Sequence, residues 1–89
     1  MTKNEVHCSR AMFFEVKSFD IFEELKTIVD KHGFLNFPVQ KEFEDGTKYI
    51  NFYFEIKNFN LALAANKEVL KTLGFDSTIW NADFTKTLD

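Results

Sequence analysis

Alternation of apolar and polar residues predicts four strands in this chain. The first covers 6–18, and its most regular part is 11–17. Two more cover 35–44 and 48–56, and a last one covers 78–86. A two-residue period is typical of a strand that turns one face toward a core.

Apolar residues at three- and four-residue spacing predict two helices. The first covers 20–32, and the second starts at Asn58 or Asn60 and ends at Leu73. We expect the core-facing side of the second helix to hold Leu63, Asn66, Val69, Leu70 and Leu73.

Capping signals mark the ends of both helices. Asp20 and Glu23 have the spacing of a capping box, and Asn58 or Asn60 can cap the second helix. A Gly-Phe pair follows each helix, where glycine can take the left-handed conformation that ends a helix.

The dipeptide Asp45-Gly46 predicts a β-hairpin with a two-residue turn. That turn fixes the register, setting Val39 opposite Phe52 and Phe37 opposite Phe54. This register places most apolar side chains of the hairpin on one face. Burial of that face against the core would specify this register.

A repeated stretch organises these elements. Residues 13–21 recur in conservatively altered form at 53–61, with four of nine positions identical, each as a strand end that runs into a helix. The order β-α-β-β-α-β predicts a single α+β domain over 1–89. The expected fold is a ferredoxin-like sandwich with a four-stranded antiparallel sheet, two helices on one face and an internal βαβ repeat. We expect the two copies at the sheet centre, and the strands holding Pro38 and Trp80 at its edges.

Composition narrows the classes of function. The 89 residues are 45% hydrophobic with twelve Phe, so a core can form, and the net charge is −3. The only arginine is Arg10, and arginine is the preferred ligand for phosphates, so nucleic acid is an unfavoured partner.

A single cysteine excludes an internal disulfide, and no apolar stretch approaches the roughly 18 residues of a membrane span. We expect a cytoplasmic protein. Its amino-acid composition is typical of a bacterial or phage genome rich in A and T.

The sheet face that the helices leave open is the first candidate binding surface. Its candidate residues are Phe13, Glu15, Tyr49, Asn51, Tyr53 and Glu55. Clustered exposed aromatics mark protein contacts, so we predict that this face binds a protein partner or a second copy of the chain. We expect Glu15 to pair with Lys57, and Glu55 with Lys17, across the two central strands.

Two alternatives use other chemistry. Rings at the centre of an open sheet resemble the RNA-recognition motif, so Phe13, Tyr49 and Tyr53 could stack the bases of a single strand. However, 48–52 lacks the glycines of that motif, and acidic residues on the same face repel phosphates. The second alternative is an acidic site for a basic protein at the hairpin tip, formed by Glu42, Glu44 and Asp45.

Catalytic and metal-binding chemistry has few candidates. His7, Cys8 and His32 show no paired spacing, and strand alternation puts His7 and Cys8 on opposite faces. We expect Cys8 to be a small core residue and His32 to be a cation at a helix end. The sequence therefore predicts no metal, no cofactor and no enzyme activity. It predicts a protein-binding domain that acts as an inhibitor or regulatory subunit by occluding its partner.

Overall fold

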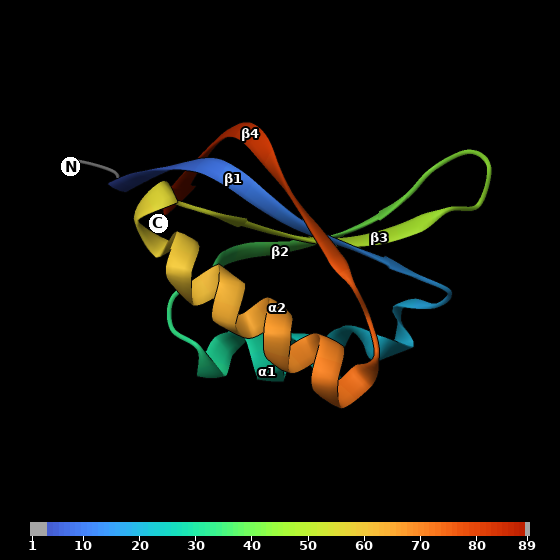
Figure 1. The fold of residues 1–89 in the computed structure, drawn as a ribbon. Helices are drawn as coiled ribbons and strands as arrows, with labels where there is room; N and C mark the ends of the chain where they lie inside the picture. The colour runs from blue at the N-terminus through green and yellow to red at the C-terminus, as the bar shows by residue number, and fades with distance from the viewer. Residues whose placement is uncertain (1–3, 89) are drawn as a thin grey trace.

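The chain forms one layer of sheet and one layer of helices (Figure 1). The computed structural model describes residues 4–88, without the side chains of Asn36 and Leu88. It is an α+β structure whose elements follow the order β1 (Asn4–Val16), η1 (Phe19–Ile21), α1 (Phe22–Lys31), β2 (Asn36–Glu42), β3 (Lys48–Phe54), η2 (Ile56–Asn58), α2 (Phe59–Leu73) and β4 (Ser77–Leu88), where η marks a single 3₁₀ turn.

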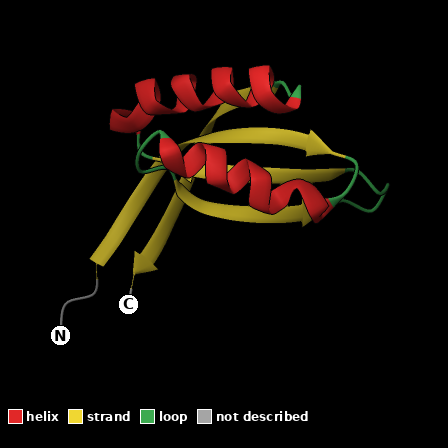
Figure 2. Cartoon of the chain, turned by 90° about the horizontal axis from the view of Figure 1, so that it is seen from below, coloured by secondary structure: helices red, strands yellow, loops and turns green. Residues whose placement is uncertain are grey.

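The sheet is antiparallel and has the strand order β2-β3-β1-β4. The two repeated strands pair at its centre, with Phe13 opposite Asn51, as the sequence repeat predicts. The strands that hold Pro38 and Trp80 are the edges, which confirms that prediction too. Residues of β1 before Arg10 pair only with β4, and Figure 2 shows these two strands running past the others.

Both helices cover the same face of the sheet (Figures 1 and 2). Beneath them, β1 and β3 contribute alternate apolar side chains, including Phe14, which meets Phe52 edge-on at 6.0 Å between ring centroids. The core also buries Met12, Val16, Leu25, Ile28, Val29, Leu35, Ile50, Phe54, Ala62, Ala65 and Val69. In the described part of the chain, no helix combines the length and apolar character needed to cross a membrane.

Helix α2 presents a different side to the sheet than the sequence pattern predicts. Ala62, Ala65 and Val69 are buried, whereas Leu63 and Leu70 are 38% and 49% exposed. The pattern was ambiguous because α2 is apolar around much of its circumference. Small alanines let a helix approach a layer already filled by large rings, so the side that fits best faces inward. The prediction of a buried Leu70 is wrong.

The turn of the β2–β3 hairpin has three residues, 44–46, between the paired residues Phe43 and Thr47, rather than the predicted two. The Phe43 N–H donates to the Thr47 carbonyl at 2.9 Å, and the Gly46 N–H donates to the Phe43 carbonyl at 2.9 Å. Gly46 has a φ of +90°, the left-handed conformation that follows a type I turn in three-residue hairpins. The Thr47 N–H donates to Asp45, and this hydrogen bond lowers the pKa of the Asp45 carboxyl.

One additional loop residue shifts the hairpin register by one position. Because side chains alternate along a strand, this shift moves the side chains of β2 to the face opposite the predicted one. Val39 lies opposite Asn51 rather than Phe52, so the predicted pair is wrong. Phe37, predicted opposite Phe54, lies at an irregularity in the β2–β3 pairing with a φ of +52°.

The helix starts are capped differently from the prediction. The Asp20 N–H donates to Ser18 Oγ at 3.2 Å, so Ser18 caps the turn that leads into α1 and Asp20 does not. Asn58 precedes α2 but makes no side-chain cap, and its amide donates instead to the Phe34 carbonyl at 2.7 Å. Gly74 ends α2 with a φ of +77°, which confirms the predicted stop signal.

Glu68 on α2 connects the two helices. Its carboxylate accepts from Lys31 Nζ at 2.5 Å and from His32 Nε2 at 2.8 Å, both at the end of α1. The hydrogen bond from Lys31, and then that from His32, lowers the pKa of Glu68. A lowered pKa in the folded state stabilises the fold above the ordinary glutamate value of 4.5, and this contribution is lost as pH falls through the lowered pKa.

We therefore expect Glu68→Gln to lower the melting temperature at pH 7. The difference between variant and wild type should shrink as pH falls below the ordinary glutamate pKa, because the wild-type carboxylate then takes up a proton. Thermal unfolding followed by circular dichroism from pH 7 to pH 3 measures this. Glu24→Gln, at an exposed position of α1, is the control. A Glu68→Gln effect that stays constant over this range would contradict the ion-pair explanation.

Candidate functional site

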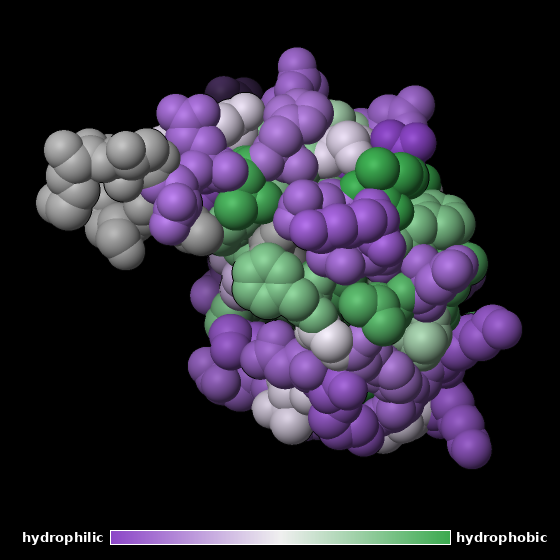
Figure 3. All heavy atoms as spheres, turned by 90° about the vertical axis from the view of Figure 1, so that its left-hand side faces the viewer, coloured by the Kyte–Doolittle hydropathy of each residue, from purple (hydrophilic) through white to green (hydrophobic). Residues whose placement is uncertain are grey.

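Seven aromatic rings form two groups of contacting rings on the sheet face that the helices leave uncovered. We call them the open-face rings, and they are Phe13, Phe37, Phe43, Tyr49, Tyr53, Trp80 and Phe84. They come from all three segments that form this face: β1, the β2–β3 hairpin and β4. At the end of the molecule seen in Figure 3, apolar side chains instead form small areas separated by polar ones.

Four of the open-face rings form one continuous group. The Phe13 ring lies 4.8 Å from the Trp80 ring and 6.5 Å from the Tyr49 ring, measured between centroids. Phe43 meets Tyr49 edge-on at 5.4 Å. Trp80 and Phe43 are 56% and 44% exposed, so the group presents large apolar rings to solvent.

The other three open-face rings form a second group near the β1–β4 ribbon. Tyr53 stacks on Phe84 at 4.5 Å with an interplanar angle of 15°, and Phe37 lies 6.4 Å from Phe84. Phe84 reaches Tyr53 next to a shift in the β1–β4 register, between Cys8 and Arg10. These rings are partly buried, and their packing supports the sheet rather than exposing a contact surface.

Asn51 lies on β3, between β1 and β2, at the centre of the open face. Its neighbours in the pairing are Phe13 on β1 and Val39 on β2, and only 1% of its surface is exposed. Among the described residues, nothing donates a hydrogen bond to its buried Oδ1 atom. An unsatisfied buried acceptor costs about 1–3 kcal/mol, so native proteins rarely keep one without a reason.

A cavity of about 110 Å³ opens beside this amide. We call it the Asn51 pocket, and its lining residues are Phe13, Lys41, Phe43, Tyr49, Asn51 and Trp80. Lys41 is exposed, and its ammonium lies 5.1 Å from the centroid of the Phe43 ring, a cation–π arrangement. The pocket therefore combines aromatic walls, one buried acceptor and one positive charge at the rim.

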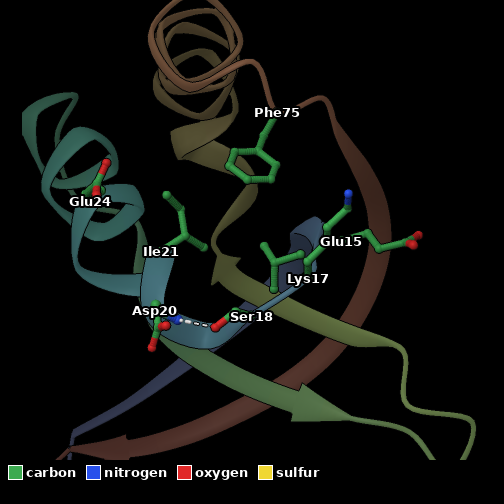
Figure 4. Close-up of a pocket in the computed structure, with 8 residues that line it drawn as sticks. Glu15, Lys17, Ser18, Asp20, Ile21, Glu24 and Phe75 are labelled. Carbon is green, nitrogen blue, oxygen red and sulfur yellow. Dashed lines mark hydrogen bonds between the residues drawn. The ribbon is translucent and has the colours of Figure 1, made fainter.

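A larger hollow of about 570 Å³ lies between the end of β1 and the segment after α2. Figure 4 shows Phe75 and Ile21 pointing toward the same space, whereas the Glu15 carboxylate points away from it. The polar residues that line this hollow are all exposed, so none needs a ligand to satisfy its hydrogen bonds. Its lining includes Lys17, Ser18, Asp20 and Glu24.

The structure brings together part of the predicted open-face site. Phe13, Tyr49 and Asn51 line one pocket, while Tyr53 belongs to the second group of rings. Glu15 is exposed and lies opposite Tyr49, next to this pocket in the pairing.

Glu55 does not line the Asn51 pocket. It follows the end of β3, and because β1 and β3 are antiparallel it lies at the opposite end of the sheet from Glu15. The predicted pairs, Glu15 with Lys57 and Glu55 with Lys17, are wrong. They would require β1 and β3 to run parallel. Glu55 pairs instead with Lys57, two residues along the chain, at 3.6 Å.

The acidic hairpin tip is a separate feature. Glu42 pairs with Lys48 at 3.8 Å, and Glu44 and Asp45 are exposed in the loop. Phe43 lies between these acids in the sequence but belongs to the Asn51 pocket. The tip therefore adjoins the pocket and does not form part of its lining.

Sequence reasoning missed three residues of the pocket, Lys41, Phe43 and Trp80. Lys41 and Phe43 were missed because the two-residue turn put them in the wrong register. Trp80 stands in the alternating pattern of the last strand, and its pairing opposite Ala11 beside Phe13 would have been needed to place it here.

Each histidine contacts one carboxylate. His7 lies 2.6 Å from Asp83, with both side chains exposed, and His32 contacts Glu68. Cys8 is fully buried, which confirms the prediction of a core position. Within residues 4–88, no group of three or more His, Cys, Asp or Glu side chains is placed to hold a metal ion.

Comparison with known proteins assigns no family. The sequence matches no protein-family model and no curated protein. The arrangement of the open-face rings and of the Asn51 pocket is therefore the basis for the function proposed next.

Proposed function

We propose that this chain is a non-enzymatic protein-binding domain whose open sheet face covers part of a partner protein, as an inhibitor or a regulatory subunit does. The supporting observation is the pair of exposed rings, Trp80 and Phe43, beside Phe13. Burying apolar surface contributes about 25 cal/mol per Å², and aromatic residues dominate the binding energy of protein interfaces.

The charges favour a protein over a nucleic acid. Lys41 is the one cation in the lining of the Asn51 pocket, and Glu15 lies nearby in the sheet pairing. The net charge of −3 also disfavours binding to the phosphates of a nucleic acid. Stacking of bases on the open-face rings is therefore the second candidate.

We further propose that the architecture is the ferredoxin-like split βαβ arrangement, built from two related halves. The repeat of 13–21 at 53–61, and the central pairing of β1 with β3, support this. One sheet face is then left free for binding, because both crossover helices lie on the other face.

Phe43→Ser/Trp80→Ser tests the proposed function. Both side chains are about half exposed and lie outside the core, so we expect the double variant to fold like the wild type. Loss of hot-spot rings, each contributing on the order of 2 kcal/mol, should weaken partner binding roughly 30-fold or more. Tagged wild-type chain would capture the partner from native host cells for mass spectrometry, and calorimetry with the purified partner would compare both chains.

Glu42→Lys/Glu44→Lys is the matched control, because it alters the neighbouring hairpin tip and leaves the rings. We expect it to bind the partner nearly as well as the wild type. Binding that survives the ring variant and fails in the charge variant would instead assign the contact to the acidic tip. Micromolar binding of short single-stranded DNA or RNA that weakens steeply with salt would favour the nucleic-acid alternative.

A further inference from the structure

A positive and a negative charge flank Tyr49 on the open face. Lys41 on β2 and Glu15 on β1 both pair with Tyr49 of β3, so the three residues form one row across the sheet. Residues directly opposite each other on neighbouring strands point to the same face of a sheet. Both charged side chains are exposed, and neither forms an ion pair with another described residue. Each charge is therefore available to an occupant of this face.

The next row repeats this arrangement with apolar residues. Val39 on β2 and Phe13 on β1 both pair with Asn51 of β3. Because β2 and β1 lie on the two sides of β3, a half-turn about a line that runs along β3, above the open face, exchanges the positions of the two flanking strands. The same half-turn exchanges the position of Lys41 with that of Glu15, and the position of Val39 with that of Phe13.

Two copies that pack open face against open face can be related by this half-turn. Stacked sheets lie about 10 Å apart, a gap that a lysine and a glutamate side chain reaching from opposite sheets can span. Lys41 of each copy would then meet Glu15 of the other copy, and Phe13 of each would pack against Val39 of the other. Every contact would form twice, because a two-fold interface uses the same surface on both copies.

The charges of the open face favour a second copy over a different protein. Among residues 10–16, 36–42, 48–54 and 77–81, where the strands pair, the register puts only Lys41 and Glu15 as charged residues on this face. The paired strands therefore present no net charge that would repel an identical face. A different protein would have to carry an acid and a base at matching places, whereas a second copy supplies both by symmetry. The same contact would remove apolar surface of Phe43 and Trp80 from water.

We propose that the open face binds a second copy of this chain, with a two-fold axis along β3 and with Lys41 of each copy paired with Glu15 of the other. The inference rests on the proposed function, because it takes the open face as the protein-binding surface and identifies the protein that covers it. The rings supply the buried apolar surface, and the two ion pairs fix how the copies are oriented.

Charge reversal at one member of the pair tests this proposal. We expect the wild-type chain to change from monomer to dimer as its concentration rises in sedimentation equilibrium. Lys41→Glu sets acid against acid at both symmetry-related positions, and Glu15→Lys sets base against base, so each variant should dimerise about 10- to 100-fold more weakly. Lys67→Glu and Glu24→Lys are the matched controls, because they make the same changes in charge at exposed positions of the helices. We expect both controls to dimerise like the wild type.

The double variant Lys41→Glu/Glu15→Lys should restore the dimer. It exchanges the two charges, so acid meets base again, and it keeps the net charge of the wild type. An equimolar mixture of the two single variants should also dimerise, for the same reason. The proposal would be overturned by a wild type that stays monomeric, by a dimer that both single variants leave intact, or by a double variant that dimerises as weakly as the single ones. Circular dichroism checks that each variant is folded, as expected for changes at exposed positions.

Failure of this inference can be told apart from failure of the proposed function. If the wild type stays monomeric while Phe43→Ser/Trp80→Ser loses a captured protein of another sequence, the open face is the interface and that protein is its occupant. If the dimer follows the charges as expected while Phe43→Ser/Trp80→Ser keeps a captured protein, the second copy occupies the open face and the captured protein binds elsewhere.

Discussion

Phe54→Ala should lower the free energy of unfolding by about 3–5 kcal/mol. The Phe54 side chain is fully buried in the core between the sheet and the helices. Its removal loses the hydrophobic transfer energy and leaves a cavity that the surrounding rings cannot fill without shifting. Small domains are usually stable by about 5–15 kcal/mol, so the variant loses a large share of its stability.

Urea unfolding followed by circular dichroism measures this change, because the midpoint falls while the slope stays constant. Phe34→Ala is the control, since it removes the same ring from a position that is 60% exposed. We expect the control to change stability by less than about 1 kcal/mol. Similar losses for both variants would mean that Phe54 does not lie in the core.

Asn51→Leu should have the opposite sign and raise the free energy of unfolding by about 1–3 kcal/mol. The amide is buried with an unsatisfied Oδ1 atom, so the folded protein bears its desolvation cost. Leucine has a similar size and no polar atom, and it would pack against the neighbouring Phe13 ring.

Asn51→Asp is the matched control, because it keeps the shape of the side chain and places a carboxylate there. Burial disfavours the charged form, so this variant should be less stable than the wild type at pH 7. The same urea experiment measures both variants. If Asn51→Leu were destabilising, the amide would have a hydrogen-bond partner in the isolated protein, and the folded state would not bear the cost of an unsatisfied acceptor.

A substitution that stabilises the protein at the centre of a predicted binding face would indicate that the native residue is kept for binding. Natural proteins keep costly groups where binding or catalysis requires them, so stability and activity compete at such positions. Asn51 and Phe54 lie three positions apart on β3, one toward the open face and one toward the core. The same strand therefore serves binding on one side and stability on the other.

The secondary structure could be predicted because its signals are local. Alternation over 11–17 and 48–54 marks strands, and Gly74 marks a helix end without knowledge of distant residues. The repeat at 13–21 and 53–61 added a long-range prediction, since related halves place their copies side by side. The open-face positions of Phe13, Tyr49 and Asn51 followed from the same alternation.

The hairpin register and the orientation of α2 could not be predicted, because in each case two solutions fit the sequence nearly equally. Asp45-Gly46 suits a two-residue turn and also the three-residue turn that forms. Choosing between them determines whether Phe43 joins the Asn51 pocket. The pocket itself needs Trp80 beside Phe13, and only the β1–β4 register gives that contact.

The position of β1 at the sheet centre has a consequence for biosynthesis. Both of its neighbours, β3 and β4, come later in the chain, so Asn4–Val16 leaves the ribosome with no strand to pair with until Lys48–Phe54 follows. At about 5–20 residues per second, this apolar segment stays unpaired for seconds, whereas the β2–β3 hairpin can close locally in microseconds. Newly made chains thus carry Met12, Phe14 and Val16 exposed during that interval, and this segment is where chaperones would bind or where aggregation would begin.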